Sequence, residues 1–333
     1  MLPDVALTVL WLGVTLYAIF GGADFGAGFW DLVAGGAERG RRTRARIEHS
    51  IGPVWEANHV WLIFSLVVVW TAFPPVFAAV ASTLYIPFTI AAIGVIARGS
   101  AFVFRKETED LRVERLFGAA FATSSVLTPF AFGTIAGAIA SFRVPPGIAR
   151  GDVWGAWLNP TSMLGGVVAV LVAAYLAAVY LTADARRDGE HDLAEQFRRR
   201  AIATGVLLGA VGIAGGFVLH SDAPKLFAGL TGRAAPVLVL SAVFGGVSLL
   251  LLKRGAFLLV RGTAALAVVL GVWSWGVAQY PTLLQPDVTP TSAAAPSEVL
   301  VAVIVGLGIG AVLIVPSLAL LFSLFQRPGQ SAD

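Results

Sequence analysis

The sequence predicts an all-α, polytopic membrane protein, a bundle of about nine transmembrane helices. Hydrophobic residues make up 57% of the 333 residues and charged residues 13%, whereas about 25% of an ordinary soluble chain is charged. Apolar runs of about 20 residues recur along the chain, and this length crosses the hydrocarbon core of a bilayer as a helix. A transmembrane β-barrel is disfavoured, because its strands would be short and would alternate apolar with polar residues.

The predicted spans begin at the N-terminus, where MLPDVALTVLWLG lacks the basic region and the small-residue cleavage site of a removed signal. The first helix is therefore expected to be retained. Pro74 and Pro75 mark a tight turn between the second and third spans, since proline suits the first turn of a helix. Residues 1–333 then form one integral membrane domain, whose nine predicted spans are 5–27, 53–72, 75–100, 114–140, 160–183, 201–219, 235–252, 256–279 and 296–325.

Basic residues are concentrated in alternate loops. The first, third, fifth and seventh loops and the C-terminal tail hold most of the lysines and arginines, whereas the opposite loops hold Arg143, Arg150, Lys225 and Arg233. Cytoplasmic loops carry such an excess, so the N-terminus is predicted to lie outside and the C-terminus in the cytoplasm. The same distribution explains the formal net charge of +3, and we expect no nucleic-acid partner.

Two long polar connections join the predicted spans. Residues 184–200, DARRDGEHDLAEQFRRR, are a polar cytoplasmic loop whose mixed charges suit an extension of the flanking helices into solvent. Residues 280–297 are rich in proline, serine, threonine and alanine and are expected to form an irregular external loop. Cysteine is absent, which excludes disulfides, thiolate metal sites and cysteine nucleophiles.

A carboxylate lies inside the first predicted span. In GGADFGAGFWDL, Asp24 is flanked by apolar residues, whereas Asp31 lies nearer the interface. The surrounding glycines let a neighbouring backbone come close. Because an ionisable group within a membrane helix is costly and is by default a functional candidate, Asp24 is predicted to be a buried proton-exchanging group. The alternative is a carboxylate that caps a helix or pairs with a loop arginine.

A second polar group enters the second predicted span, in HSIGPVWEANHVWLI. Glu56 and His59 are three residues apart and therefore share one helix face, and burial brings both toward the range in which proton transfer is feasible near neutral pH. Asn58 points elsewhere and is expected to bond to a neighbouring helix. The alternative is a satisfied polar patch that holds helices together. Haem ligation by His59 is less attractive, because a lone histidine is a weak signal.

Two further features concern how the spans pack. Arg98, on the cytoplasmic end of the third span, is expected to pair with a carboxylate such as Asp24 or Glu56. Small residues at four-residue spacing, such as Gly133 and Gly137, let helix backbones approach closely. This spacing favours a compact bundle or a contact between subunits.

The two polar motifs together resemble the N-terminal signature of subunit II of cytochrome bd-type quinol oxidases, including the cyanide-insensitive oxidase branch. The resembling stretches are GGADFGAGFWDL and IGPVWEANHVWLI. The resemblance continues through ARGSAFVFRKE at 97–107 and WLNPTSMLGGVV at 157–168. The first 170 residues carry the specific motifs, and the remainder matches mainly in hydropathy.

The resemblance implies a subunit of a quinol:oxygen oxidoreductase, a terminal respiratory oxidase that reduces O₂ to water in a bacterial plasma membrane. In that family the b-type and d-type haems are on the larger subunit I. This chain would then not be catalytic alone, but would stabilise subunit I and form part of its proton path. Some members contain a structural quinone, and some have an acidic residue where this chain has Val103. The proton-path candidates are Asp24, Glu56 and His59. The supporting candidates are Trp55, Asn58, Arg98 and Lys106.

The small number of possible haem ligands on this chain agrees with haems that are bound by subunit I. Of the four histidines only His59 lies inside a predicted span, and Met163 is the sole methionine after Met1. These are too few to hold three haems in the usual manner. We therefore expect no metal site and no haem ligand on this chain. The expected partners are subunit I and membrane lipid, with quinol and O₂ as substrates of the complex.

Two other functions remain open from the residues alone. One is a proton-coupled secondary transporter that uses Asp24 and Glu56 as coupling carboxylates, although the sequence has no paired interrupted helices and no inverted repeat. The other is a purely structural membrane scaffold.

Overall fold

The computed structural model describes residues 1–51, 55–107 and 111–325, with side chains left out at 37, 51, 105–107, 111, 112, 114, 258, 321, 322, 324 and 325. The described residues are almost entirely helical, apart from loops and one isolated bridge between Leu284 and Val288. The helices in chain order are α1 (Leu2–Leu32), α2 (Ala37–Ile51), α3 (Trp55–Asn58), α4 (Val60–Ala72), α5 (Pro74–Thr83), α6 (Tyr85–Glu107), α7 (Leu111–Ala140), α8 (Pro160–Arg187), α9 (His191–Asp222), α10 (Pro224–Thr231), α11 (Ala235–Arg254), α12 (Phe257–Gln279), α13 (Pro290–Ala293) and α14 (Ser297–Phe325).

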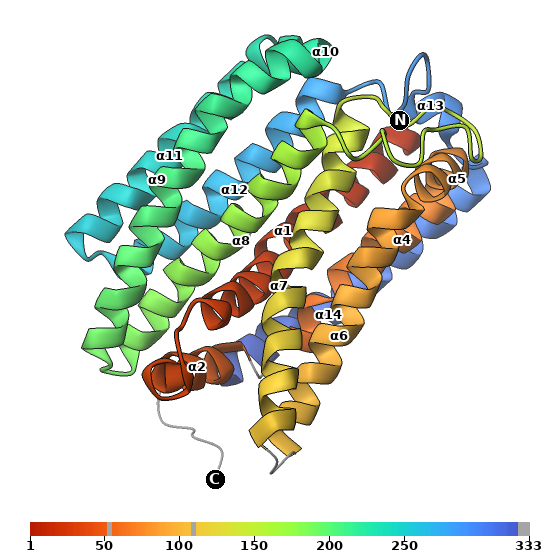
Figure 1. The fold of residues 1–333 in the computed structure, drawn as a ribbon. Coiled ribbons are helices and arrows are strands. Elements are labelled where there is room, and N and C mark those ends of the chain that lie inside the picture. The colour runs from red at the N-terminus through yellow and green to blue at the C-terminus, as the bar shows by residue number, and fades with distance from the viewer. Residues whose placement is uncertain (52–54, 108–110, 326–333) are drawn as a thin grey trace.

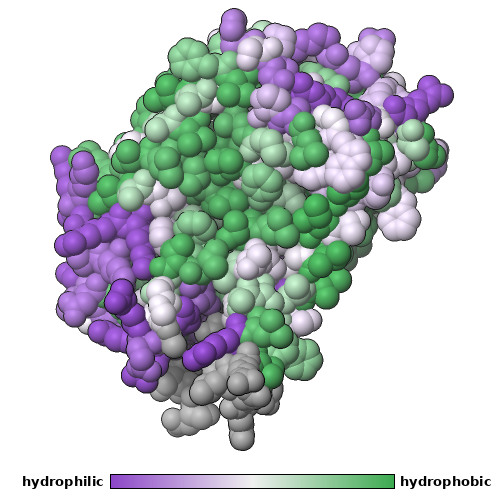
Figure 2. All heavy atoms as spheres, in the orientation of Figure 1, coloured by the Kyte–Doolittle hydropathy of each residue, from purple (hydrophilic) through white to green (hydrophobic). Residues whose placement is uncertain are grey.

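The described part of the chain contains eight helices long and apolar enough to cross a membrane. A ninth span results if the bent pair Glu38–Ser50 and Trp55–Ala72 is counted as one. On the face that Figure 2 shows, a hydrophobic band crosses the middle of the molecule and hydrophilic residues gather toward its two ends. The predicted all-α, multi-pass membrane bundle is therefore confirmed.

The bundle is arranged around two central helices (Figure 1). α1 and α8 run between a group formed by α9, α10, α11 and α12 and a second group formed by α4, α5, α6, α7 and α14. The largest buried cluster lies where α1, α7, α8, α9 and α12 meet, and includes Trp30, Phe121, Leu176, Phe197 and Val260. α1 begins at the end where α5 and α13 lie, and α2 lies at the opposite end. We call the α2 end the basic end.

Glycine allows the central helices to touch backbone to backbone. A Cβ at Gly26 of α1 would lie 1.8 Å from the carbonyl oxygen of Ala173 in α8. The neighbouring Trp30 also donates its indole N–H to the Ala174 carbonyl at 2.8 Å. Likewise a Cβ at Gly133 of α7 would lie 2.3 Å from the carbonyl oxygen of Gly165 in α8. The absence of side chains at these glycines thus allows α8 to pack closely against both α1 and α7, as close packing of membrane helices requires.

The second and third predicted spans differ from the observed helices. The part of the second span that is described forms α3 and α4, because His59 separates them, and residues 53 and 54 lie outside the described ranges. The predicted third span 75–100 is also not one helix, since it is divided at Leu84 into the short α5 and the longer α6. Pro87 explains the second break. Proline cannot donate a backbone hydrogen bond and fits best in the first turn of a helix, which is where α6, beginning at Tyr85, places it.

The predicted polar loop 184–200 is mostly helix. α8 continues to Arg187 and α9 starts at His191, which leaves a short turn between them. Arg46 of α2 reaches that turn and donates to Asp188 at 2.6 Å and to Glu190 at 3.3 Å. Partial burial of the Asp188 carboxyl acts to raise its pKa, but hydrogen bonds and charge from Arg46 and Arg187 together outweigh burial and lower the pKa. These two ion pairs bind α2 to the turn between α8 and α9 at the basic end.

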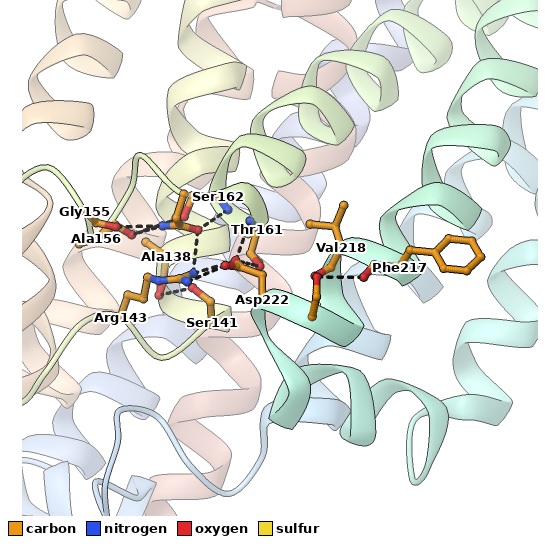
Figure 3. A network of polar contacts seen from close by, with 12 residues as sticks. Ala138, Ser141, Arg143, Gly155, Ala156, Thr161, Ser162, Phe217, Val218 and Asp222 are labelled. Carbon is orange, nitrogen blue, oxygen red and sulfur yellow. Dashed lines mark hydrogen bonds and ion pairs between the residues drawn. The ribbon is translucent and has the colours of Figure 1, made fainter.

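The opposite end is held by a network around one carboxylate (Figure 3). Asp222, the last residue of α9, accepts hydrogen bonds from Arg143 at 2.8 and 3.0 Å. It also accepts from the backbone N–H and the hydroxyl of Thr161, at 3.0 and 2.5 Å. Arg143 donates further to Asn159, whose side chain caps the start of α8. The network therefore joins the ends of α7, α8 and α9.

Asp222→Asn is expected to lower the thermal stability of the purified protein. An amide retains one acceptor oxygen but turns an N–H₂ group toward donors, which leaves part of the Arg143 guanidinium unpaired. The loss should be about 2 kcal/mol, the usual range for hydrogen bonds to a charged group. The measurement is the unfolding midpoint in detergent. Ser221→Ala is the matched control, since that hydroxyl bonds only to carbonyls of its own helix, and an equal loss in both variants would contradict the assignment.

Candidate functional site

The candidate site is built around Asp24, which lies in an uninterrupted helix. α1 continues through the glycine-rich segment without a break, and Asp24 is eight residues from its last residue, Leu32. At 1.5 Å per residue this places the carboxylate about 12 Å inside the end of the helix. Asp24 is only 3% exposed. A carboxylate at this depth requires polar partners from the neighbouring helices.

The partner of the carboxylate is Asn58 of α3. Its amide Nδ2 donates to Asp24 Oδ2 at 2.7 Å, and both residues are buried. The expectation that Asn58 bonds to a neighbouring helix therefore corresponds to a specific contact with α1. Asp31 has a different environment, because its carboxylate accepts from Arg44 of α2 at 2.7 Å. Asp31, rather than Asp24, thus corresponds to the alternative of a carboxylate paired with a loop arginine.

Arg98 of α6 lies beside the same pair and is 1% exposed. Its Nη2 donates to the backbone carbonyl of Asp24 at 2.9 Å, and its Nε donates to Ser125 Oγ at 3.1 Å. The guanidinium also lies over the rings of Phe25 and Phe121, at 5.1 and 5.0 Å from their centres. A cation held by aromatic faces and neutral acceptors gives Asp24 an opposite charge nearby.

His59 and Trp55 lie on the edge of this cluster. His59 is half-buried at the junction of α3 and α4, with its Nδ1 3.5 Å from the hydroxyl of Tyr17. Its ring packs edge-on against Phe25 and Trp55, at centre distances of 5.9 and 6.3 Å. Trp55 is also half-buried and packs against Phe102 of α6. Both residues therefore contribute mainly aromatic contacts around the polar centre.

Two predicted site residues are placed differently from the expectation. Glu56 is exposed on the surface of this chain, so Glu56 and His59 do not share one buried helix face. The reason is that α3 turns Asn58 inward, and residues two positions apart in a helix are about 200° apart around its axis, so a buried Asn58 leaves Glu56 on the outside. The side chain of Lys106 lies outside the described residues.

Two contributors to the cluster were not predicted from the sequence. Ser125 accepts from Arg98 and donates to the Phe121 carbonyl at 2.7 Å, and Tyr17 approaches His59. Tyr17 is seven residues before Asp24, which is about two helical turns, so its position on the same face was a usable signal. Ser125 follows Thr123 and Ser124 in the sequence, and nothing in that pattern distinguishes Ser125 from its hydroxyl-bearing neighbours.

The cluster contains one carboxylate, one amide and one guanidinium, which suits proton exchange at a fixed acid. Its donors do not suit haem or metal ligation, since His59 is the one histidine close to it and already faces Tyr17. Within residues 1–51, 55–107 and 111–325, no group of three histidine, cysteine, aspartate or glutamate side chains converges on one point.

Fold and site together define a multi-pass helical membrane protein with a buried, paired carboxylate between its helices. Comparison with known families is specific, because residues 2–325 match the model of the family described as cytochrome bd terminal oxidase subunit II. The chain belongs to this family and is a multi-pass bacterial membrane protein.

Individual relatives agree with this family. The chain is 30% identical to cytochrome bd ubiquinol oxidase subunit 2 of Bacillus subtilis (strain 168) over 181 residues, which are 54% of this chain and 51% of that protein. It is 28% identical to cytochrome bd-I ubiquinol oxidase subunit 2 of Escherichia coli (strain K12), over 54% of this chain and 48% of that protein. These matches span about half the length of the relatives.

A solved structure supports the fold over the whole length. The bd oxidase from Geobacillus thermodenitrificans contains a chain that superposes on this one with a TM-score of 0.74. The match covers 98% of this chain and 99% of that chain, at 24% sequence identity. At this identity the likeness concerns the arrangement of the helices.

Proposed function

We propose that this chain is the haem-poor, structural and proton-path subunit of a membrane quinol:oxygen oxidoreductase that reduces O₂ to water. The observation that carries the proposal is the match to the subunit II family over residues 2–325. The buried pair of Asp24 and Asn58 supports the proton-path part, because it is an ionisable group held far from the aqueous phase.

The haems belong to a partner in this proposal. Haems b and d, bound by subunit I, would supply electron transfer and oxygen reduction, and the complex would take quinol as its reductant. The donor set described for the cluster fits no haem, so this chain would contribute protons and packing. A structural quinone elsewhere in the complex is compatible with this role.

The partner would cover the face that carries Glu56. On this chain Glu56 is exposed and is two residues before Asn58 in α3. Because Asn58 bonds to Asp24, Glu56 lies at about the same level along α1 as Asp24. Val60 and Ile63, one and two helical turns further along, are also exposed and are apolar. A carboxylate facing lipid at this depth would be costly. Contact with subunit I removes that cost if the partner offers water or a polar group.

The test of the proposed function is to purify the full chain with whatever co-assembles and record a reduced-minus-oxidised visible spectrum. The proposal expects haem bands from a co-purified partner and quinol-driven oxygen uptake. Substrate uptake by this chain alone in liposomes, without haem, would instead establish a transporter. A complex that binds haem and consumes oxygen at the same rate without this chain would leave it as a scaffold only.

Glu56→Gln is expected to slow oxygen reduction at saturating quinol by at least about tenfold, because an amide cannot take up and release a proton. The haem spectrum should be unchanged. The measurement is oxygen uptake by the purified complex, with Glu38→Gln as the control, since Glu38 is an exposed acid on α2. Unchanged turnover in Glu56→Gln would remove Glu56 from the proton path, and loss of the partner subunit would assign it to assembly.

A further inference from the structure

We propose that Asn58 is the positioning residue of Asp24, holding carboxylate oxygen Oδ2 so that Oδ1 is the atom that takes up and releases the proton. This inference rests on the proposed proton-path function of Asp24 and assigns the two oxygens of its carboxylate different tasks.

The first observation is the asymmetry of the carboxylate. Asn58 Nδ2 donates to Oδ2 at 2.7 Å. Among the described residues, no donor reaches Oδ1. An amide N–H₂ group is a donor that keeps its own protons over the whole accessible pH range. Oδ2 is therefore occupied whether Asp24 is charged or neutral, and Oδ1 is left for proton exchange.

The second observation is that the remainder of Asp24 is fixed independently of Asn58. Arg98 donates to the backbone carbonyl of Asp24 at 2.9 Å, so α6 holds the main chain of α1 at this residue. Ser125 of α7 in turn accepts from Arg98 at 3.1 Å. With its backbone held by α6 and α7, the carboxylate retains mainly the rotation about its side-chain bonds. The bond from Asn58 removes that rotation.

The third observation is how the chain brings Asn58 to this position. α3 is a single turn that ends at Asn58, and the helix restarts after His59, with the His59 N–H donating to the Glu56 carbonyl at 3.2 Å. Glu56 and Asn58 both belong to α3, and residues two positions apart in a helix are about 200° apart around its axis. The face of α3 that carries Asn58 therefore lies toward Asp24 of α1, while Glu56 is on the outer surface.

The proposed step is a simple proton transfer. On uptake, a proton from water or hydronium forms an O–H bond at Oδ1 and neutralises the carboxylate. On release, the same bond breaks and the proton leaves to a water molecule or to the next acid. Oδ2 is the carbonyl oxygen of the neutral acid and continues to accept from Asn58 throughout. No electron changes place and the amide is unaltered.

The test is a pH-induced infrared difference spectrum of the purified complex that contains the full chain. The C=O stretch of neutral Asp24 is identified as the band that Asp24→Asn removes. In Asn58→Leu this band is expected to move to higher wavenumber, because its carbonyl oxygen has lost a hydrogen bond. Turnover should fall by roughly tenfold to a hundredfold, as for a displaced reacting group. Ser124→Ala is the matched control, since this buried hydroxyl bonds to the Phe121 carbonyl of its own helix.

The outcomes separate the positioning role from the proposed function. A band that stays in place in Asn58→Leu, or the absence of an Asp24 band across the accessible pH range, would overturn the inference. A displaced band together with full turnover in Asp24→Asn would support the positioning role and refute the proton path. If Asn58→Leu does not assemble, Asn58→Ser serves the same test, because its shorter side chain cannot reach Oδ2, and it should displace the band in the same direction.

Discussion

Gly26→Val is expected to abolish the folded subunit. A Cβ at Gly26 would lie 1.8 Å from the Ala173 carbonyl oxygen and 2.3 Å from its carbonyl carbon, and both are backbone atoms of α8. Neither helix can yield locally, so α1 and α8 would have to separate and lose the hydrogen bond from Trp30 to Ala174. The cost should be about 3 kcal/mol or more, at the upper end of overpacking. The measurement is the amount of monodisperse protein recovered from membranes by size exclusion.

Gly22→Ala is the matched control for this change. Gly22 is one turn earlier on α1, and a Cβ there would meet only the Leu176 side chain, at an ordinary contact distance of 3.9 Å. This variant should be recovered like the unmodified protein. If Gly26→Val were recovered equally well, the close contact of α1 and α8 would not be part of the fold in the membrane.

The sequence is sufficient for the existence of the membrane helices, because their length and apolarity are physical requirements of the bilayer. It was not sufficient for the break at Leu84. Apart from Ser82 and Thr83 the flanking residues are largely apolar, so these two polar residues do not interrupt the predicted span 75–100, and Pro87 was the main indication of a new helix start. The depth of α1 in the bundle was also predictable only in part. Its glycines indicate close packing, but only the three-dimensional structure identifies α8 as the neighbour.

The sequence predicted which residues belong to the candidate site better than it predicted which of them contact one another. Asp24 stands out because a carboxylate in an apolar, glycine-rich helix needs a reason. The partner could not be deduced in the same way, since helical spacing gave Glu56 and His59 a common face and turned Asn58 away. In the structure it is instead the Asn58 side of α3 that faces α1, and Glu56 is exposed. Arg98 was placed near Asp24, but its actual acceptors are a backbone carbonyl and a serine.

Asp24→Asn is expected to reduce quinol-driven oxygen consumption by about a hundredfold, within the range for loss of a positioned proton-transfer group. Asparagine has nearly the same shape and can still accept from Asn58, so packing between α1 and α3 should be retained. It cannot bind and release a proton. Haem content and the visible spectrum of the complex should therefore stay normal while turnover falls. The measurement is oxygen uptake at saturating quinol, together with proton uptake per turnover.

Two further variants decide whether that loss reflects the titratable group. Asp24→Glu should recover a measurable part of the activity, since it restores an ionisable carboxyl although its longer side chain is displaced from Asn58. Asp4→Asn should leave turnover unchanged, because Asp4 lies at the opposite end of α1, where it contacts the N-terminus and Tyr280. Full proton-coupled turnover in Asp24→Asn would mean that protons reach the oxygen site by another route. Asp24 and Asn58 would then have a structural role only, as a hydrogen bond that joins α1 and α3.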